Sequence, residues 1–270
     1  MRVTARFCGG AVAVVMLLLT AQAVRAQEAP SVDEIVKKAN HVAYYQGKDG
    51  RAKVTMTIRD AQKNVRTREF TILRRDGDGK EDRDQKFYVY FHRPADVNKM
   101  AFLVWKHVGK DDDRWLYLPA LDLVKRIAAS DERTSFVGSD FFYEDVSGRG
   151  IEEDKHELLK TTKDFYLLKN TPIKTESVEF SYYTMWIHRK TFIPVKIEYY
   201  DKRGQKYREY TAKKVDKVDG FDTVTISSMK DIASGSETTL TYDEVKYDVD
   251  LDDDIFTARY LKRPPRRHLR

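Results

Sequence analysis

The sequence predicts a mainly β protein, built either as an antiparallel barrel or as one large curved sheet. About a dozen segments of strand-like composition follow one another at short, regular spacing and are separated by turn sequences. Only one segment carries a strong helix signature. No linker rich in Pro, Gly or Ser divides the 270 residues, and no repeat of fixed period is present, so we expect one domain.

The clear helix comes first. Ser31 and Glu34 form an S-x-x-E capping box, in which each side chain accepts a hydrogen bond from the backbone N–H of the other residue. Apolar residues then recur at helical spacing from Val32 to Tyr45, and Gly47 ends the pattern. This amphipathic helix must pack its apolar stripe against another element.

The strands follow the helix and begin with clear alternation of apolar and polar residues. In chain order, the candidate strands are residues 53–59, 66–74, 86–92, 100–105, 114–118, 124–127, 164–169, 177–188, 192–200, 205–213, 223–230 and 237–247. Short helices are expected at residues 141–146 and 254–261.

Two of the strands, residues 86–92 and 100–105, are apolar on both faces. A sheet with a strongly apolar face needs a cover, and one long helix with a few short ones covers only part of so many strands. The remaining apolar area therefore forms either a filled core or a ligand cavity. Hydrophobic periodicity does not distinguish these two outcomes.

The first 26 residues have the three parts of a secretory signal peptide. Arg2 and Arg6 provide the positive start, residues 11–20 form the apolar stretch, and a cleavage site follows Ala26, with Ala23 as the alternative. The apolar stretch is shorter than the ~20 residues that span a bilayer, which disfavours an uncleaved membrane anchor.

We therefore expect residues 1–26 to be removed and residues 27–270 to form one periplasmic domain. The single cysteine, Cys8, precedes the apolar stretch, whereas a lipoprotein signal places its cysteine at the cleavage site. A mature chain without cysteine excludes disulfides, thiol catalysis and cysteine-ligated metals.

The charge balance argues against a nucleic-acid-binding protein. The chain has 49 Lys and Arg against 43 Asp and Glu, a formal charge of +6. Half of that excess is Arg2, Arg6 and Arg25, within the predicted signal peptide. The rest of the chain is nearly balanced and lacks the concentrated basic field of a nucleic-acid binder.

A search for catalytic and metal-binding patterns points to a binding protein. The six histidines show no H-x-H or H-E-x-x-H spacing. The acidic run at residues 250–254 lacks the glycine and glutamate of a calcium loop, since Ile255 and Leu261 occupy those positions. Ser139 is not in a G-x-S-x-G sequence and suits a helix cap better than a nucleophile. We expect no catalytic residue, no metal and no cofactor.

Three segments carry a family resemblance. They are DRWLYLPAL at residues 113–121, followed by Arg126-Ile127; FVGSDFFYEDV at residues 136–146; and the ending IFTARYLK at residues 255–262. Together with the leading helix and the strand-rich body, they resemble the outer membrane lipoprotein-sorting protein family. Its relatives include the periplasmic lipoprotein carrier and its outer-membrane receptor.

The resemblance implies an incomplete, open antiparallel β-barrel of about eleven strands, with helices as a plug or lid. It implies a monomeric, non-enzymatic protein that shields acyl chains of a lipid or lipoprotein. Its expected partner is a transporter of the resistance-nodulation-division type or an outer-membrane receptor. Two alternatives remain open: an envelope sensor that recognises lipoprotein or lipid and signals to a membrane partner, and a hydrolase that acts on an envelope lipid.

On this reading, alternate strand residues line the apolar cavity. The predicted lining residues are Val54, Met56, Ile58, Phe70, Ile72, Phe87, Val89, Phe91, Phe102, Val104, Trp115 and Tyr117. Core packing is the alternative role for each of them.

Other predicted contacts involve the lid, the head group and the C-terminal tail. Phe141 and Phe142 are lid candidates, and Arg114 and Arg126 are candidates for holding a head group, with ion pairs to nearby aspartates as their alternative. The basic tail at residues 262–270 either touches anionic lipid or forms a disordered end.

Overall fold

The structure, a computed structural model, describes residues 29–77 and 82–269. The predicted signal peptide, residues 1–26, lies outside the described residues. The fold below is that of the unit Ser31–Arg270.

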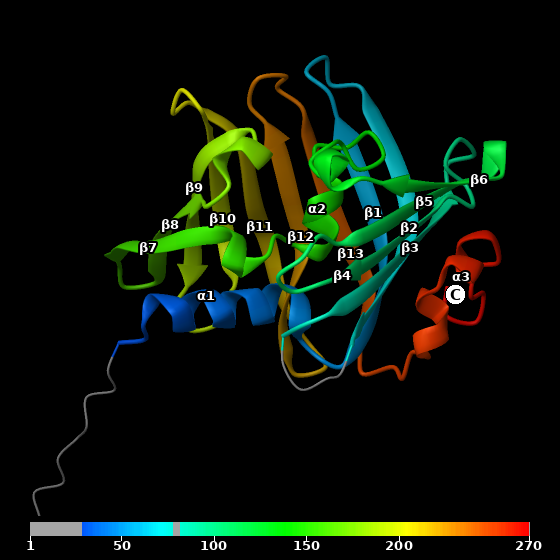
Figure 1. The fold of residues 1–270 in the computed structure, drawn as a ribbon, viewed down its shortest axis with the longest axis horizontal. Coiled ribbons are helices and arrows are strands. Elements are labelled where there is room, and N and C mark those ends of the chain that lie inside the picture. Colours follow the sequence, from blue (N-terminus) through cyan, green and yellow to red (C-terminus); the bar gives the residue numbers. More distant parts are fainter. Residues whose placement is uncertain (1–28, 78–81, 270) are drawn as a thin grey trace, which may run out of the picture. The chain divides into compact units, whose positions relative to one another are not determined.

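The described residues contain one antiparallel sheet of thirteen strands and three short α-helices (Figure 1). The strands are β1 (Asp49–Arg59), β2 (Val65–Asp76), β3 (Gln85–Arg93), β4 (Ala101–Lys106), β5 (Asp113–Leu118), β6 (Leu123–Ile127), β7 (Asp154–Thr161), β8 (Phe165–Pro172), β9 (Phe180–His188), β10 (Pro194–Asp201), β11 (Lys206–Val218), β12 (Phe221–Asp231) and β13 (Glu237–Tyr247). The helices are α1 (Val32–Asn40), α2 (Tyr143–Ser147) and α3 (Ala258–Lys262).

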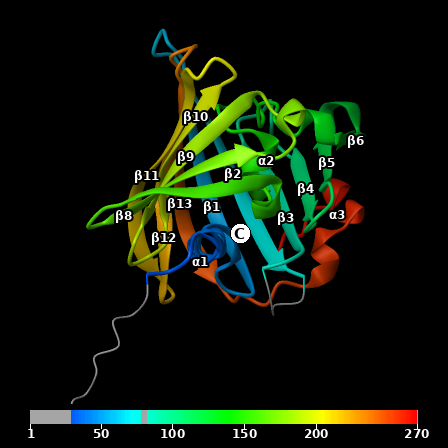
Figure 2. The same ribbon diagram turned by 60° about the vertical axis from the view of Figure 1, so that its left-hand side comes forward.

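The strand order places the two middle strands of the sequence at the two edges of the sheet. The order is β6-β5-β4-β3-β2-β1-β13-β12-β11-β10-β9-β8-β7, so β1 pairs with β13, and β6 and β7 are edges. The chain must therefore cross from one edge to the other between Ile127 and Asp154. We call residues 128–153 the crossing segment; it contains α2, which lies inside the curve of the sheet (Figure 2).

Helix α1 begins as its capping box predicts. Glu34 N–H donates to Ser31 Oγ at 3.2 Å, and Ser31 N–H donates to Glu34 Oε2 at 2.9 Å. The helix continues into a π-helical turn, His41–Tyr45. Its buried stripe packs on the concave face of β8 and β9, in the cluster formed by Ile35, Val36, Ala39, Tyr166, Leu168 and Ile187.

Strands β3 and β4 are apolar on both faces because each face has its own cover. On the concave face their side chains join the main core with the crossing segment. On the convex face, Tyr88 and Leu103 pack with α3 and the C-terminal residues. Trp105 Nε1 donates to Phe256 O at 2.7 Å, and Leu269 is buried in the same cluster, so residues 262–269 of the basic tail pack on the sheet and are not a disordered end.

The predicted fold class is confirmed: the protein is mainly β, with an open antiparallel sheet that does not close into a barrel. Thirteen strands form where about eleven were expected. The strand without a sequence prediction is β7, an edge strand whose side chains are mostly exposed, so it shows little of the alternation that marks a half-buried strand.

Candidate functional site

An apolar cavity of about 370 Å³ lies on the concave face, among α1, the crossing segment and strands from both halves of the sheet. Its volume falls in the range of about 300–1,000 Å³ that is typical of ligand pockets. The apolar lining comprises Val36, Ala39, Val42, Ala43, Ala52, Met56, Phe70, Ile72, Phe87, Val89, Phe136, Phe141, Val146, Ile151, Met185, Ile193, Pro194, Ile197, Val224, Met229, Leu240 and Val245.

Ten of the twelve residues predicted to line a cavity lie on the concave face, in two groups. Met56, Phe70, Ile72, Phe87 and Val89 do line it. A second group lies in the same hydrophobic cluster but in its filled part, away from the cavity wall: Val54, Ile58, Phe91, Phe102 and Val104. The concave face is therefore partly filled and partly hollow.

Phe136 of the crossing segment separates the filled part from the hollow part. Its ring lies 5.9 Å from that of Phe91 and 5.6 Å from that of Phe102, and it also lines the cavity. The Phe136 ring also lies 6.3 Å from the Phe70 ring and 5.5 Å from the Tyr143 ring. Ile151 of the same segment packs with the other cluster, beside α1, β8 and β9.

The prediction that Trp115 and Tyr117 line the cavity is wrong, because they lie on the other face of β5. Both pack in the convex cluster with α3, where the rings of Trp115 and Trp105 are 5.2 Å apart. The residue between them, Leu116, points into the concave core. Successive side chains of a strand point to opposite faces of the sheet. An assignment that is wrong by one residue therefore puts every side chain of the strand on the wrong face.

The two arginines proposed for a head group form ion pairs outside the cavity lining. Arg114, only 2% exposed, donates to Glu132 Oε2 at 2.7 Å and to Asp112 Oδ2 at 2.8 Å. Arg126 is exposed and pairs with Asp113. Both arginines therefore have the ion-pair arrangement that was the alternative to head-group binding.

The two lid candidates have different surroundings. Phe141 is buried in the concave core and lines the cavity. The Phe142 ring lies 3.8 Å from the guanidinium carbon of Arg208, a cation–π contact. Ser139 Oγ donates to Phe136 O at 2.7 Å and accepts from Phe141 N–H at 3.2 Å, so this hydroxyl shapes the loop before α2.

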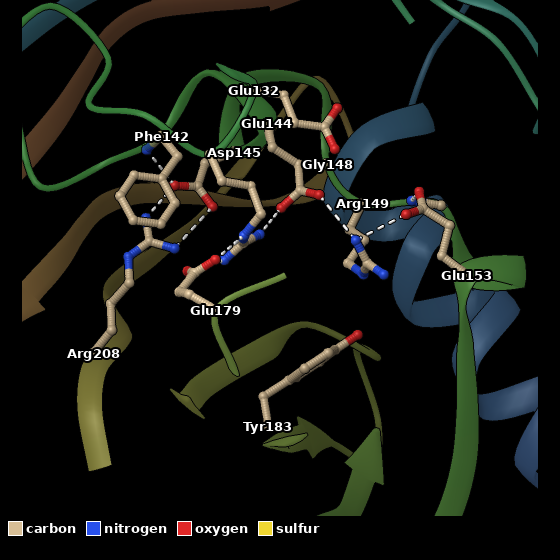
Figure 3. A network of polar contacts seen from close by, with 12 residues as sticks. Glu132, Phe142, Glu144, Asp145, Gly148, Arg149, Glu153, Glu179, Tyr183 and Arg208 are labelled. Atoms are coloured by element: carbon tan, nitrogen blue, oxygen red, sulfur yellow. Dashed lines mark hydrogen bonds and ion pairs between the residues drawn. The ribbon is translucent and has the colours of Figure 1, made fainter. Parts of the chain in front are cut away.

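Buried ion pairs fix the crossing segment to the β9–β11 side of the sheet (Figure 3). Glu144, 4% exposed, lies between Arg133 and Arg149. Arg133 also donates to Glu179 Oε2 at 2.7 Å, next to β9, and Arg208 of β11 pairs with Asp145. Burial alone would raise the pKa of Glu179, but hydrogen bonds from Arg133 hold it at about 2.

Further contacts fix the same segment to the β4–β5 side. The buried Lys106 Nζ donates to Ser147 O and to Gly148 O, both at 2.7 Å. Glu132 bonds to Arg114, yet burial and then the neighbouring Glu144 raise its pKa to about 7. The crossing segment is therefore held at both halves of the sheet, with the cavity beneath it.

Gly148 allows the π-helical turn that follows α1 and the crossing segment to approach each other beside the cavity. It adopts φ +77°, and a Cβ atom there would lie 2.5 Å from Tyr44 Cε2. Tyr44 and Gly148 both line the cavity. Only glycine combines this backbone conformation with the space that the Tyr44 ring occupies.

The cavity also has polar lining residues that the sequence analysis did not identify. Tyr199, Tyr210 and Tyr242 line it from β10, β11 and β13, and burial raises the pKa of Tyr242 to about 12. His156 and Asn170 line it from β7 and β8. The sequence shows which side chains share one face of each of these strands. It does not show that this face points to the cavity, because that depends on the pairing of β1 with β13, which joins the two halves of the sheet.

Comparison of the fold with solved structures gives the class of protein. A LolA superfamily protein from Nitrosomonas europaea matches with a TM-score of 0.66 and 22% identity, over 86% of this chain and 100% of that chain. The chain therefore has a LolA-like fold: an open antiparallel sheet with helices on its concave side.

The family follows from more similar proteins. A DUF1329 family protein from Desulfovibrio piger is 30% identical, with a TM-score of 0.77, and covers 86% of this chain and 100% of that chain. A family model described as "Uncharacterized protein" matches residues 83–263. The chain belongs to the DUF1329 family.

A second solved structure agrees with the resemblance seen in the sequence. It is a putative outer membrane lipoprotein-sorting protein domain from Vibrio parahaemolyticus, 28% identical with a TM-score of 0.77, over 85% of this chain and 97% of that chain. No curated protein matches the chain. Within residues 29–77 and 82–269, no helix is long and apolar enough to cross a membrane.

Proposed function

We propose that the protein is a non-enzymatic periplasmic carrier that shields the acyl chains of a lipid or lipoprotein. The observation that carries this proposal is the apolar cavity of about 370 Å³ between the sheet, α1 and the crossing segment. Exposing acyl chains to water costs about 0.8 kcal/mol per CH₂ group. A cavity walled by Met, Ile, Leu, Val and Phe side chains removes that cost without any catalytic group.

The comparisons support the same class of cargo. The domain from Vibrio parahaemolyticus is described as an outer membrane lipoprotein-sorting protein, and it matches 97% of its length to this chain. Under the proposal, residues 1–26 direct export and are removed, and the remaining chain works as a monomer. Cargo exchange would take place with a resistance-nodulation-division type transporter or with an outer-membrane receptor.

A titration with a fluorescent fatty-acid probe tests acyl-chain binding. Val42 is half-buried and lines the cavity, so Val42→Trp fills part of the space at little cost to packing. Val65→Trp is the matched control, because Val65 is 50% exposed and lies outside the lining. We expect the wild type and Val65→Trp to bind the probe and Val42→Trp to lose at least ten-fold in affinity. Equal binding by all three proteins would contradict the proposal.

A further inference from the structure

Two exposed leucines flank the turn between β5 and β6. Leu121 is 70% exposed and Leu123 is 46% exposed, and neither lines the cavity. Single apolar side chains on a surface are ordinary, whereas neighbouring ones on one turn often mark a surface that meets a membrane or another protein. The turn therefore needs an explanation that the cavity does not provide.

Contacts with β5 and α3 hold this turn in one conformation. Asp122, between the two leucines, adopts φ 44°. Its Oδ1 atom accepts a hydrogen bond from Tyr117 Oη at 3.1 Å and lies 2.9 Å from Lys262 Nζ, which also donates to Asp122 O at 3.0 Å. The leucines are therefore presented on a fixed support, with α3 beside the β5–β6 end of the sheet (Figure 1).

Basic side chains lie on both sides of the turn. Leu123 and Lys125 share one face of β6, and Arg126 lies on the opposite face, which packs with α3. Three further exposed basic residues lie in α3 or directly after it: Arg259, Lys262 and Arg263.

Most of this positive charge is not balanced within the protein. The turn, β6 and α3 with Arg263 contain five basic residues and one acid, Asp122, which pairs with Lys262. Arg126 pairs with Asp113 of β5. The other three basic residues form no ion pair within residues 29–77 and 82–269, so three positive charges remain unpaired around the leucines.

The acidic run that precedes α3 does not supply the missing partners. Asp253 bonds to Lys86 at 2.7 Å, at the start of β3. Lys86 lies opposite Trp105, and Trp105 lies opposite Asp113 at the start of β5, whereas the turn follows the end of β5. Asp253 is therefore at the opposite end of β5 from the leucines, and α3 leads from there to Lys262 beside the turn.

The combination of leucines and unpaired cations fits an anionic membrane surface. Leucines that enter the boundary between head groups and acyl chains bury apolar area, and Lys and Arg beside them are attracted to anionic head groups. The core of a protein–protein interface, in contrast, is depleted of charged residues, lysine among them. Lys125, two residues from Leu123 on the same face of β6, therefore favours a lipid surface over a protein partner.

We propose that the β5–β6 turn and the end of α3 together bind the surface of a membrane that contains anionic lipid. We call this surface the tip patch; it consists of Leu121, Leu123, Lys125, Arg126, Arg259, Lys262 and Arg263. None of these residues lines the cavity, so this binding is additional to the proposed acyl-chain site and does not rest on it. The leucines insert, and the basic side chains contact the head groups.

Co-sedimentation with lipid vesicles tests the tip patch in the purified protein. One set of vesicles contains phosphatidylcholine alone, and the other also contains phosphatidylglycerol, which is anionic. We expect the wild type to bind the anionic vesicles at least about ten-fold more tightly, and this preference should shrink as salt is added, because salt screens exposed charges. Val42→Trp should bind both sets as the wild type does, since Val42 belongs to the cavity.

A pair of double variants tests the role of the leucines. Leu121→Ser with Leu123→Ser should weaken binding to the anionic vesicles by about ten-fold, because two apolar side chains no longer leave water. The matched control is Leu158→Ser with Leu159→Ser, at 38% and 53% exposed positions of β7, the opposite edge of the sheet. This control should bind like the wild type. Thermal unfolding of both proteins verifies that they are folded.

A second pair of double variants tests the role of the charges. Lys125→Gln with Arg263→Gln removes two unpaired cations of the tip patch and should weaken binding to the anionic vesicles by about ten-fold. Lys155→Gln with Lys160→Gln causes the same loss of net charge at exposed positions of β7 and should change the affinity by less than about three-fold.

Three results would overturn the inference. Equal affinity of the wild type for the two sets of vesicles would remove the role of charge. Equal affinities of the tip-patch variants and the β7 controls would show that the protein does not bind vesicles through this surface. Binding of the wild type to neither set would reject the tip patch as a membrane surface, while the fatty-acid probe would still report on the cavity.

Discussion

The filled part and the hollow part of the concave face have the same kinds of side chain but differ in how closely those side chains pack. In the filled part, the Phe136 ring of the crossing segment packs against the rings of Phe91 and Phe102, at 5.9 and 5.6 Å. Beneath α1, the sheet faces a cavity lined by residues such as Met185 and Ile197. Apolar composition alone therefore does not decide whether a sheet encloses a core or a binding site; how closely the covering side chains pack against it decides which one forms.

The largest expected effect tests this contrast through stability. Phe102→Ala removes a fully buried ring from the filled part and should lower the free energy of unfolding by about 3–5 kcal/mol. Met185→Ala acts on a half-buried side chain that already borders empty space, so about 1 kcal/mol is expected. Urea denaturation of both variants measures the two values. Equal losses would remove the distinction between the two parts.

The next effect concerns the buried ion pairs within the crossing segment. Glu144→Gln leaves Arg133 and Arg149 without their shared carboxylate, and breaking a buried pair in this way costs about 3 kcal/mol. Glu157→Gln, at an exposed position of β7, is the control and should change the free energy of unfolding by less than about 0.5 kcal/mol. A Glu144→Gln protein as stable as the control would mean that these ion pairs do not stabilise the crossing segment.

A pair of glycine substitutions measures how closely the π-helical turn that follows α1 approaches the crossing segment. Gly148 and Gly204 adopt nearly the same backbone conformation, φ +77° and +75°, but only Gly148 faces a neighbour within 4 Å. Gly204→Ala should cost about 1 kcal/mol for the conformation alone. Gly148→Ala should cost about 2 kcal/mol or more, because Tyr44 must also move. Thermal unfolding of both variants makes the comparison, and equal shifts would show that the Tyr44 contact is unimportant.

The smallest effect is a pH dependence that arises in the crossing segment. Burial, with the neighbouring Glu144, raises the pKa of Glu132 from 4.5 to about 7, so the folded protein holds this proton more tightly than the unfolded chain. The stabilisation is complete below pH 4.5 and is lost as the pH rises through 7. Because the carboxylate is 23% exposed, we expect a loss of only about 1 kcal/mol.

Glu132→Gln should remove this part of the pH dependence. Urea denaturation of the wild type and the variant at several pH values between 4.5 and 7.5 provides the measurement. Parallel stability curves for the two proteins would show that Glu132 titrates normally in the folded state.

Local patterns were enough to predict the helix and most strands. The capping box at Ser31 and the alternation along β1 act between near neighbours, and near neighbours are visible in one sequence. Strand β7 lacked that signal because most of its side chains face solvent. The face of β5 was misassigned because Trp115 and Leu116 are both apolar, and only the position of α3 shows that Trp115 belongs on the convex side.

The cavity itself depends on contacts that no local pattern reveals. Val54 lies opposite Tyr242 in the pairing of β1 with β13, and this long-range pairing places the second half of the sheet across from the first. The wall at Phe136 depends on the path of the crossing segment between the two edges. The first half of the lining could therefore be predicted from alternation, whereas Asn170 and the tyrosines of the second half could not.

The most direct test of acyl-chain binding is native mass spectrometry of the protein purified from the cells that produce it, followed by organic extraction and lipid identification. We expect a discrete added mass that extracts as a lipid or acylated species, present in the wild type and reduced in Val42→Trp. A protein of bare mass that takes up neither phospholipid nor acylated peptide on titration would contradict it, and a sensor or scaffold role would then become the better explanation.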